Sequence, residues 1–409
     1  MYRIVTNIPN YIICLFPLFL LLGAGIADVM LSIVSVAFLI RSAYKKDFKW
    51  IHEKWVQIAL FFWVYIIAIS FIAINFNIAF KHGVGFIRFI FFGIALEHTL
   101  SEKPDLQKYL LIVLSIVLTF AMIDTYYQYF DGYDFFGIQK PTENRLTGPM
   151  HHQRIGGYLH FLLYPGLLLA FHFLWQKKQI YYKLSGIMLI IFAIMPIILS
   201  GERVQIPLLF IGFLSAGLLW KNKRKFFIIS GAITLSVGIL IALFNPNIKD
   251  RLITQTIGQM SNFKEDHYIQ IWTRSLKIFL ENPLLGVGVS NFQKKCVEAK
   301  YGPTDNIERR CGLHSHNFYV ELLVETGIIG IFIILILLAT WIYKMVKLYP
   351  LWQNLPIQIG LVTCFIISFF PFLPMRSFFN NWRMALLWFI IGWLLASLKS
   401  LKSQDKIDK

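Results

Sequence analysis

Two histidines open the segment HSHNFYVELLVETGIIG, which runs from His314 to Gly330. An imidazole has an ordinary pKa of about 6.5, so it is mostly neutral at pH 7 and can accept a proton. His316 lies where a polar segment meets an apolar run, and we expect it to be a general base; the alternative is a structural histidine at the start of a helix. His314 points to another side if the stretch is helical, so we expect it to position the substrate.

Arginines are the second group of side chains that could do chemistry. A guanidinium keeps its charge and presents a planar fork that can bind phosphate oxygens at two points. Arg203 follows an apolar run and is the strongest candidate for such an anion site. The alternatives are an arginine that reaches the membrane surface, or one that is neutralised by Glu202. Arg274 is a weaker candidate, and Arg251 fits a solvated surface equally well.

A polar segment near residue 150 carries Arg145 and the adjacent pair His151 and His152. Carboxylates and cysteines at ligand spacing do not accompany the histidine pair, so we predict no metal site there. A contact to phosphate fits the segment better, with Arg145 as the candidate ligand. Arg88 lies inside an apolar run, where a charge is expensive and faces a cavity or a partner. We therefore expect Arg88 to face the interior of a helix bundle.

The elements that must position these residues are membrane helices. Apolar residues make up 57% and charged residues 15% of the 409 residues, and the mean hydropathy is +0.61. Runs of about 20 apolar residues recur from end to end, and each can cross ~30 Å of hydrocarbon. The sequence therefore predicts an all-α membrane protein with about twelve transmembrane helices, and it excludes a soluble globular chain.

The predicted spans are apolar segments separated by short polar connections. They are Tyr11–Ile26, Val29–Ile40, Val56–Ile74, Gly83–Leu96, Tyr109–Tyr126, Gly156–Trp175, Leu184–Leu199, Val204–Trp220, Phe226–Phe244, Phe318–Tyr343, Ile357–Phe370 and Met384–Leu398. The first two are nearly continuous, which predicts a tight helical hairpin.

Basic residues favour one orientation of these spans. The net charge is +17, and most lysines and arginines fall in short segments between apolar runs, which is typical of cytoplasmic loops. When the spans alternate from a cytoplasmic N-terminus, the basic segments all lie inside; they are 41–55, 176–183, 221–225, 344–348 and the tail from 399. This distribution argues against nucleic-acid binding and predicts a multi-pass protein of a bacterial inner membrane.

The same alternation places two long segments, 129–155 and 245–317, on the outer side. Loops of this length are usually functional or disordered, and the second carries apolar residues at helical spacing. Pro283 ends that pattern, because proline cannot continue a helix. We therefore expect a large, partly helical periplasmic loop. The predicted organisation is nine helices in 1–244 with a periplasmic loop at 129–155, the large loop at 245–317, three helices in 318–398 and a cytoplasmic tail at 399–409.

The cysteines agree with this placement. Cys296 and Cys311 both lie in the large outer loop, where a disulfide is permitted, whereas Cys14 and Cys364 lie inside spans. In the chain-entropy description, closing this loop would stabilise it by roughly 3 kcal/mol. The spacing does not decide between a disulfide and two free thiols at these positions.

The order of these segments resembles a known family. His316-Asn317, nine residues, Gly327, two residues and Gly330 resemble the signature of the O-antigen ligases, whose superfamily includes O-antigen polymerases and protein O-oligosaccharyltransferases. Four weaker segments are similar to the family in their order and outer location. They are YQYFDGYDFFG from Tyr127, RLTGPM from Arg145, SGER from Ser200 and NPLLGVGVSNF from Asn282.

The resemblance implies a glycan transferase that uses neither a metal nor another cofactor. Members of the family move a glycan from undecaprenyl pyrophosphate to an acceptor hydroxyl at the periplasmic face. It implies His316 as general base and Arg203 and Arg274 as diphosphate clamps. With such a donor, the loop residue Arg145 and the buried Arg88 are our candidates for contacts of the carrier-linked glycan. The implied partners are the carrier-linked glycan, a lipid A–core acceptor and membrane lipids.

Three functions remain open at this point. A ligase transfers the glycan to lipid A–core, whereas a polymerase transfers it to another carrier-linked repeat unit. The motif spacing and the compact length favour the ligase modestly. A transporter is the alternative of another class, but the inverted repeats typical of that fold are not evident.

One candidate site residue departs from the family pattern. Arg274 follows Trp272, whereas the family tends to carry its second outer-loop arginine before the tryptophan.

Overall fold

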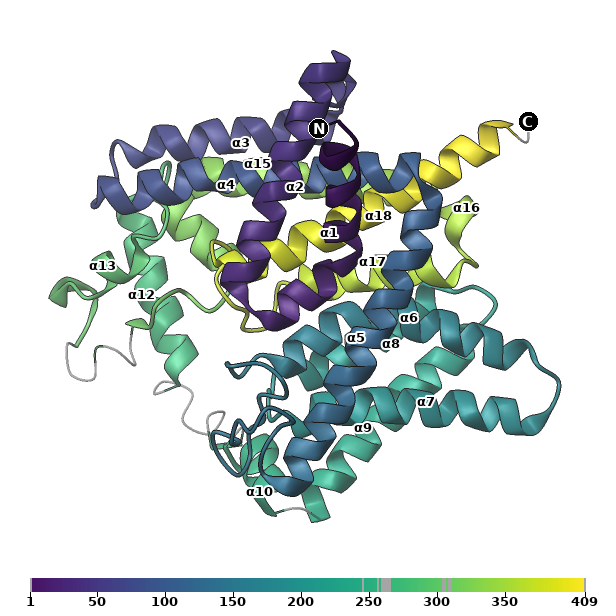
Figure 1. Cartoon of the computed structure of the whole chain (residues 1–409). Coiled ribbons are helices and arrows are strands. Elements are labelled where there is room, and N and C mark those ends of the chain that lie inside the picture. The colour runs from purple at the N-terminus through teal and green to yellow at the C-terminus, as the bar shows by residue number, and fades with distance from the viewer. Residues whose placement is uncertain are drawn as a thin grey trace.

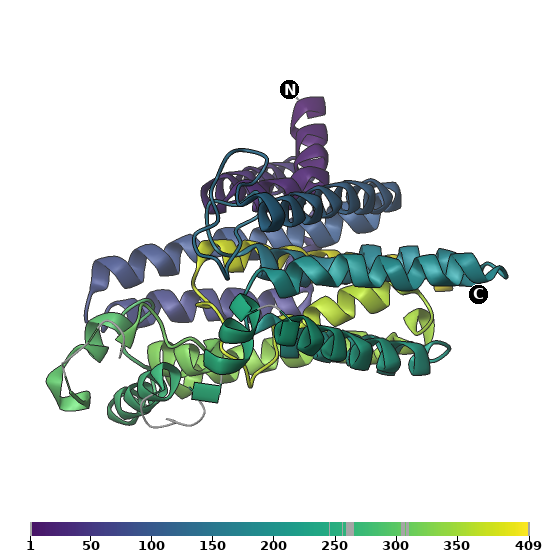
Figure 2. The ribbon, with the colours of Figure 1, turned by 90° about the horizontal axis from the view of Figure 1, so that it is seen from below.

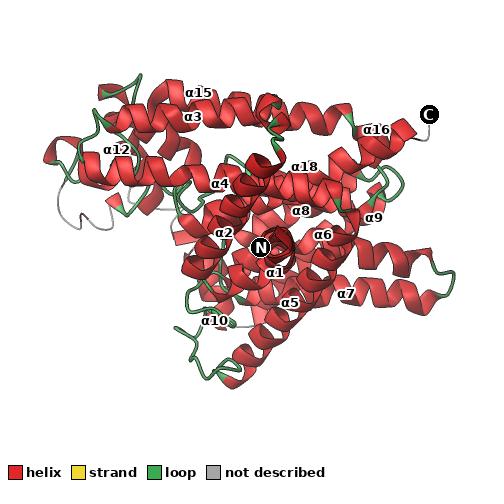
Figure 3. Ribbon diagram, turned by 45° about the horizontal axis from the view of Figure 1, so that its top comes forward, coloured by secondary structure: helices red, strands yellow, loops and turns green. Residues whose placement is uncertain are grey.

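The computed structural model is built almost entirely of helices (Figures 1 and 3). It describes residues 2–244, 246–255, 257, 258, 266–303, 307 and 311–407. Within these residues there is no extended strand, and two isolated β-bridges pair Tyr133 with Gln139 and Thr142 with Arg145. The predicted all-α fold class is therefore confirmed for the described part of the chain.

The helices follow one another in the order of the chain. They are α1 (Tyr2–Leu22), α2 (Ala24–Lys45), α3 (Lys54–Ser70), α4 (Phe76–Glu102), α5 (Pro104–Asp131), α6 (Ile155–Gln176), α7 (Ile180–Leu199), α8 (Gln205–Leu219), α9 (Arg224–Phe244), α10 (Pro246–Lys249), α12 (His267–Glu281), α13 (Phe292–Cys296), α15 (Phe318–Lys347), α16 (Tyr349–Trp352), α17 (Pro356–Ser368) and α18 (Asn381–Ile407). Single turns of other helix types cover Lys49–His52, Asp250–Thr254 and Ala299–Tyr301.

Seven of the described helices are long and apolar enough to cross a membrane. Five shorter apolar helices accompany them, and every predicted span coincides with a helix of one kind or the other. The number of spans stays a prediction. Several predicted boundaries differ by a few residues, and one predicted span crosses a break: the segment from Tyr11 to Ile26 is interrupted at Gly23, whose φ of 139° is unfavourable for other residues. The break separates α1 from α2 and forms the tight hairpin.

The two ends of the bundle carry different elements (Figures 1 and 2). Helices α12 and α13 lie at one end, whereas α16, the α6–α7 connection and the C-terminus lie at the opposite end. Between them, α3 packs against both α4 and α15, and α18 packs along α4. α12 begins at Asp266, whose carboxylate accepts hydrogen bonds from Tyr268 N (2.8 Å) and Ile269 N (3.2 Å). It ends before Pro283, as the sequence predicts.

A kink in α15 fixes the connection between α12 and α13. Gly327 breaks the helical geometry with φ 65° and ψ −172°. A Cβ at this position would lie 2.2 Å from Leu284 O, so both the conformation and the close approach require glycine. The freed amide of Ile328 donates to Pro283 O over 2.9 Å. Two features of the sequence pattern, the Asn-Pro turn and this glycine, thus form one joint.

The first turn of α15 holds the α17–α18 connection. Asn317 caps the helix by accepting a hydrogen bond from Tyr319 N (3.0 Å), and its Nδ2 donates to Pro371 O (2.7 Å). One turn later, the buried carboxylate of Glu321 accepts a hydrogen bond from Phe378 N (2.7 Å). α15 therefore brings residues near 316 and residues near 375 to the same place.

Candidate active site

Four connections between helices meet around one cavity of about 300 Å³. They are the α5–α6 connection, the α7–α8 turn, the segment between α10 and α15, and the α17–α18 connection. The cavity is lined by Arg145, Arg154, Gly157, Phe161, Glu202, Arg203, Val204, Gln205, Leu208, Arg251, Tyr268, His314, His316, Pro374, Met375, Arg376, Trp382 and Arg383. The alternation of apolar segments predicts all four connections on the same side of a membrane, and their convergence agrees with that alternation.

His316 has an unusual backbone conformation. Its φ is 51°, in the left-handed region that costs a non-glycine residue about 1–3 kcal/mol and persists only where the surroundings hold it. Met375 N donates to His316 O over 2.6 Å, and Trp272 Nε1 donates to the neighbouring Ser315 O over 2.9 Å. The α17–α18 connection and α12 therefore hold the histidine from two sides.

Neutral imidazoles form the proton-accepting part of the cavity. The ring centroids of His314 and His316 are 4.1 Å apart, and Tyr268 lies 5.4 Å from His316. Burial, followed by His314, His267 and Arg376, lowers the pKa of His316 to about 3. Burial and the same positive surroundings lower the pKa of His314 to about 4. Both rings are therefore uncharged at pH 7 and able to accept a proton.

Guanidinium groups dominate the charge of the cavity. Its arginines are Arg145, Arg154, Arg203, Arg251, Arg376 and Arg383. Glu202 is the single carboxylate among the described lining residues. Three of the arginines are anchored by backbone carbonyls, with Arg251 Nε bonded to Gly201 O (3.4 Å), Arg376 Nη2 to Gln153 O (2.9 Å) and Arg383 Nη2 to Ser368 O (2.8 Å). Such an array of forks suits an anion with several oxygens.

Two of these arginines keep an unused donor. The Nε–H groups of Arg145 and Arg154 are buried and have no hydrogen-bond partner within the described residues. The Nε2 atom of His314 is likewise buried and has no hydrogen-bond partner within the described residues. Buried polar atoms are almost always paired, and an unpaired one costs about 1–3 kcal/mol. Unused polar atoms on the wall of a cavity point to a ligand that completes them.

Glu202 ties the α7–α8 turn to α6. Its Oε1 accepts a hydrogen bond from Gly156 N (2.9 Å), and its Oε2 accepts one from Gln205 Nε2 (3.3 Å). Gln205 Oε1 in turn contacts His160 Nδ1 (2.9 Å), and His160 Nε2 contacts Tyr164 OH (2.9 Å). Burial raises the pKa of Glu202. Both carboxylate oxygens thus take part in joining the turn that carries Arg203 to the start of α6.

Arg274 lies outside the cavity, although the sequence predicts it as a diphosphate ligand. Its side chain is 3% exposed and donates to Cys296 O (2.7 Å) and to Pro303 O. Cys296 forms a disulfide with Cys311, with the Cα atoms 5.7 Å apart, so the structure contains the disulfide that the spacing left open. Arg274 therefore organises the segment that leads to His316 and does not face the cavity.

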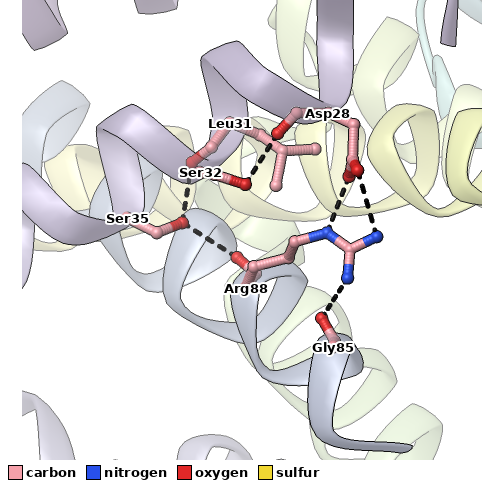
Figure 4. Close-up of polar contacts among 6 residues, drawn as sticks. All are labelled: Asp28, Leu31, Ser32, Ser35, Gly85 and Arg88. Atoms are coloured by element: carbon pink, nitrogen blue, oxygen red, sulfur yellow. Dashed lines mark hydrogen bonds and ion pairs between the residues drawn. The ribbon is translucent and has the colours of Figure 1, made fainter. Parts of the chain in front are cut away.

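Arg88 also lies apart from the cavity, in the helix bundle (Figure 4). Its Nε and Nη2 bind both carboxylate oxygens of Asp28 on α2, at 2.6 and 3.2 Å, and its Nη1 donates to Gly85 O. Ser35 adds a hydrogen bond to Arg88 O (2.9 Å). The side chain faces a partner, as its position in an apolar run predicts, and this partner is an aspartate of the neighbouring helix.

Sequence reasoning finds part of the cavity and misses the rest. His316, His314, Arg203 and Arg145 come together as lining residues, whereas Arg376 is not predicted. A signal for it exists, because Arg376 lies in the α17–α18 connection, on the side that the alternation places outside, where basic residues are uncommon. Among the described residues, no three His, Cys, Asp or Glu side chains converge as a metal site would require.

Comparison with known proteins adds one finding. Residues 187–335 match the family described as O-antigen ligase. The matched range begins in α7 and ends within α15, so it contains Arg203, Arg251 and both cavity histidines. No curated protein matches the chain. The family match therefore covers much of the cavity, while the two remaining connections lie outside it.

Proposed function

With an O-antigen ligase domain at residues 187–335, the chain belongs to the O-antigen ligase family, and we propose that it transfers O-antigen-type polysaccharide from undecaprenyl pyrophosphate to a hydroxyl of lipid A–core oligosaccharide. The reaction takes place at the periplasmic face of the bacterial inner membrane and uses no metal. One observation carries the proposal: neutral imidazoles and several guanidinium groups line the same cavity of about 300 Å³.

His316 is the general base of the proposed reaction. The acceptor hydroxyl gives its proton to the imidazole, and its oxygen attacks the anomeric carbon of the first donor sugar from the side opposite the phosphate. The bond between that carbon and the phosphate oxygen breaks, and the electron pair leaves with the diphosphate. Configuration at the carbon is inverted. A base held neutral in this way can accept the proton at physiological pH.

Arg203 is the proposed main ligand of the leaving diphosphate, with Arg145 and Arg251 beside it. Negative charge grows on the bridging phosphate oxygen as the bond breaks. Positioned guanidinium groups in a cavity with little water stabilise that charge more than they stabilise the ground state. Arg274 and Arg88 have no part in this step, because their guanidinium groups are bound to other groups of the protein.

The proposed organisation keeps the predicted boundaries. Residues 1–244 and 318–398 form the membrane bundle, 129–155 and 245–317 are periplasmic, and 399–409 is a cytoplasmic tail. The distribution of basic residues supports this orientation, because the segments on the other side from the cavity are rich in lysine and arginine. The isoprenoid tail of the donor would then lie among the helices, with its diphosphate at the level of the cavity.

A polymerase is the second candidate, because the matched family is also related to enzymes that join carrier-linked repeat units. Deletion of the protein in its native host distinguishes the two when the surface glycan is separated on a gel. A ligase deletion removes all core-attached polymer while long carrier-linked chains accumulate. A polymerase deletion leaves a core that carries a single repeat unit. Unchanged glycan together with altered uptake of a solute would indicate a transporter instead.

Substitution of His316 and Arg203 tests the site. His316→Ala and Arg203→Ala should each lower transfer by about 10²- to 10⁴-fold, while the amount of protein in the membrane stays normal. His151→Ala and Arg224→Ala are matched controls, because both residues are exposed and lie outside the cavity. Full activity of either cavity variant would remove the role assigned to that residue.

A further inference from the structure

The cavity holds more positive charge than one diphosphate needs. Six arginines and one carboxylate line it among the described residues, and both histidines are neutral. A diphosphate that joins a lipid to a sugar carries two negative charges, one on each phosphate. Like charges at such short range repel, and they are tolerated where anions neutralise them. The surplus of positive charge over the charge of the diphosphate therefore suits a second anion in the cavity.

The arginines fall into two groups around the cavity. Arg203 and Arg251 lie on the α7–α8 turn and after α10, and the charge of Arg203 acts on Arg251. Arg154 and Arg376 lie at the start of α6 and on the α17–α18 connection, and the charge of Arg376 acts on Arg154. Arg145 lies between the two groups, because both Arg376 and Arg203 act on it.

The second group is the one beside the base. Met375 N donates to His316 O (2.6 Å), which places the neighbouring Arg376 next to this histidine, and the charge of Arg376 acts on both cavity histidines. An anion bound at Arg376 is therefore close to His316, the proposed base. Because the base takes its proton from the acceptor, this anion lies where the acceptor binds.

Two arginines of the cavity, one in the second group and one between the groups, also keep an unused donor. The buried Nε–H of Arg154 lacks a partner within the described residues, and so does that of Arg145 between the groups. The guanidinium of Arg154 lies 5.8 Å from the ring centroid of Trp382, and the unpartnered Nε–H is the donor that an anion could complete. Arg383 adds charge nearby, but it is bonded to Ser368 O and lies 4.2 Å from the centroid of the Phe161 ring.

We propose that the cavity has two anion subsites: Arg203 and Arg251 hold the diphosphate of the donor, and Arg154 and Arg376 hold a carboxylate or phosphate group that the acceptor saccharide carries near its reacting hydroxyl. This inference rests on the proposed function and names the acceptor as an anionic saccharide. Arg145 contributes to both subsites. The second subsite places the acceptor hydroxyl beside His316.

Binding measurements on the full-length chain in detergent test the two subsites without turnover. With a polyprenyl diphosphate saturating, inorganic phosphate should still bind with one further equivalent. Arg376→Gln should weaken phosphate binding at least about tenfold and leave diphosphate binding unchanged, whereas Arg203→Gln should do the reverse. Loss of phosphate binding when the diphosphate saturates, or equal effects of both variants on both ligands, would overturn the proposal.

A conservative variant separates folding from binding. Arg376→Lys keeps the charge, so it should retain phosphate binding to within a few-fold, and Arg376→Gln should elute as the same monodisperse species as the wild type. If the Lys variant binds as poorly as the Gln variant despite a normal elution profile, Arg376 does not act as an anion ligand. Acetate in place of phosphate shows whether the subsite favours a carboxylate.

Transfer assays then separate this inference from the proposed function. Arg376→Gln should raise KM for an anionic acceptor by at least about tenfold and leave KM for the donor and for a neutral acceptor unchanged. An equal rise with the neutral acceptor contradicts the anionic subsite. If both anions bind as described but the protein shows no transfer activity, the two subsites stand and the proposed transferase function is wrong.

Discussion

His316 combines two properties that oppose each other. Burial and positive neighbours keep it neutral, which a base requires, but the same surroundings lower its proton affinity. A bound diphosphate brings negative charge to the cavity and offsets part of the field of Arg376. The proton affinity of His316 should therefore rise when the donor binds, so that the base becomes strong at the stage when it is needed.

The pH dependence of transfer follows from this linkage. In the free enzyme His316 has a lowered pKa of about 3, so it stays neutral as the pH falls below the ordinary histidine value. We expect kcat/KM for the donor to stay flat as the pH is lowered to about 5. We expect kcat to begin to fall at a higher pH than kcat/KM, because kcat reports the donor-bound enzyme, in which His316 takes up a proton more readily. Parallel pH profiles measure both. Identical limbs near pH 6.5 would contradict the donor-linked change.

Residue types near a span boundary predict only part of this chemistry. His316 and Arg203 are recognisable because each stands beside an apolar run within a patterned segment. Arg274 has the right type and the right neighbourhood, but it is buried against loop carbonyls, and that cannot be read from spacing. Arg376 is missed because its place outside the predicted spans does not show that it lies beside His316; the hydrogen bond from Met375 N to His316 O brings it there.

At the scale of elements, α12 and the disulfide act together on the segment before α15. Ser275 Oγ lies 3.3 Å from Ser315 Oγ, Trp272 binds Ser315 O, and Arg274 binds Cys296 O beside the disulfide. These contacts fix the residues that flank His316 without touching the cavity. Arg274 is accordingly a positioning residue.

Arg274→Gln should lower kcat for transfer by about tenfold or more, because the histidine loses its orientation, and leave the affinity for a polyprenyl diphosphate unchanged. Single-turnover rates and lipid titrations provide the two readouts. Arg203→Gln is the comparison, since it should lose affinity. A loss of diphosphate affinity in Arg274→Gln as large as in Arg203→Gln would show that Arg274 is a ligand after all.

The joint between α15 and the Asn282–Pro283 turn gives a second test at this scale. Gly327→Ala places a Cβ 2.2 Å from Leu284 O in a left-handed conformation, so it should destabilise the protein by about 2 kcal/mol or more. Gly25→Ala is the control, because no atom lies within 4 Å of its Cβ position, and a helical alanine is favoured by about 1 kcal/mol. Thermal unfolding in detergent compares them, and equal midpoints would rule out the strained joint.

Helices are more predictable here than joints. Apolar runs locate the helices because hydrocarbon requires every backbone group to be bonded within its own segment. The kink at Gly327 and the break at Gly23 depend on which atoms approach from elsewhere in the chain. Spacing alone cannot supply that information, so the predicted first span, Tyr11–Ile26, runs four residues past the end of α1 at Leu22.

For the whole molecule, the orientation makes a prediction that labelling can test. A cysteine introduced at His151 or Phe372 should react with a membrane-impermeant maleimide added to the periplasmic side, and a cysteine at Lys178 or Lys221 should not. The native free thiols do not interfere, because both are buried. Phe372 is 79% exposed, so no other part of the described protein covers it. Labelling of all four positions from one side would contradict the proposed topology.

The distribution of the cavity along the chain has a consequence for biogenesis. Its arginines extend from Arg145, before α6, to Arg383, in the last helix. A nascent chain that has inserted every helix but the final one still lacks Trp382, Arg383 and the anchored connection that precedes them. Catalytic competence therefore requires the insertion of α18, so ribosomal products truncated before this helix would be inert in the membrane.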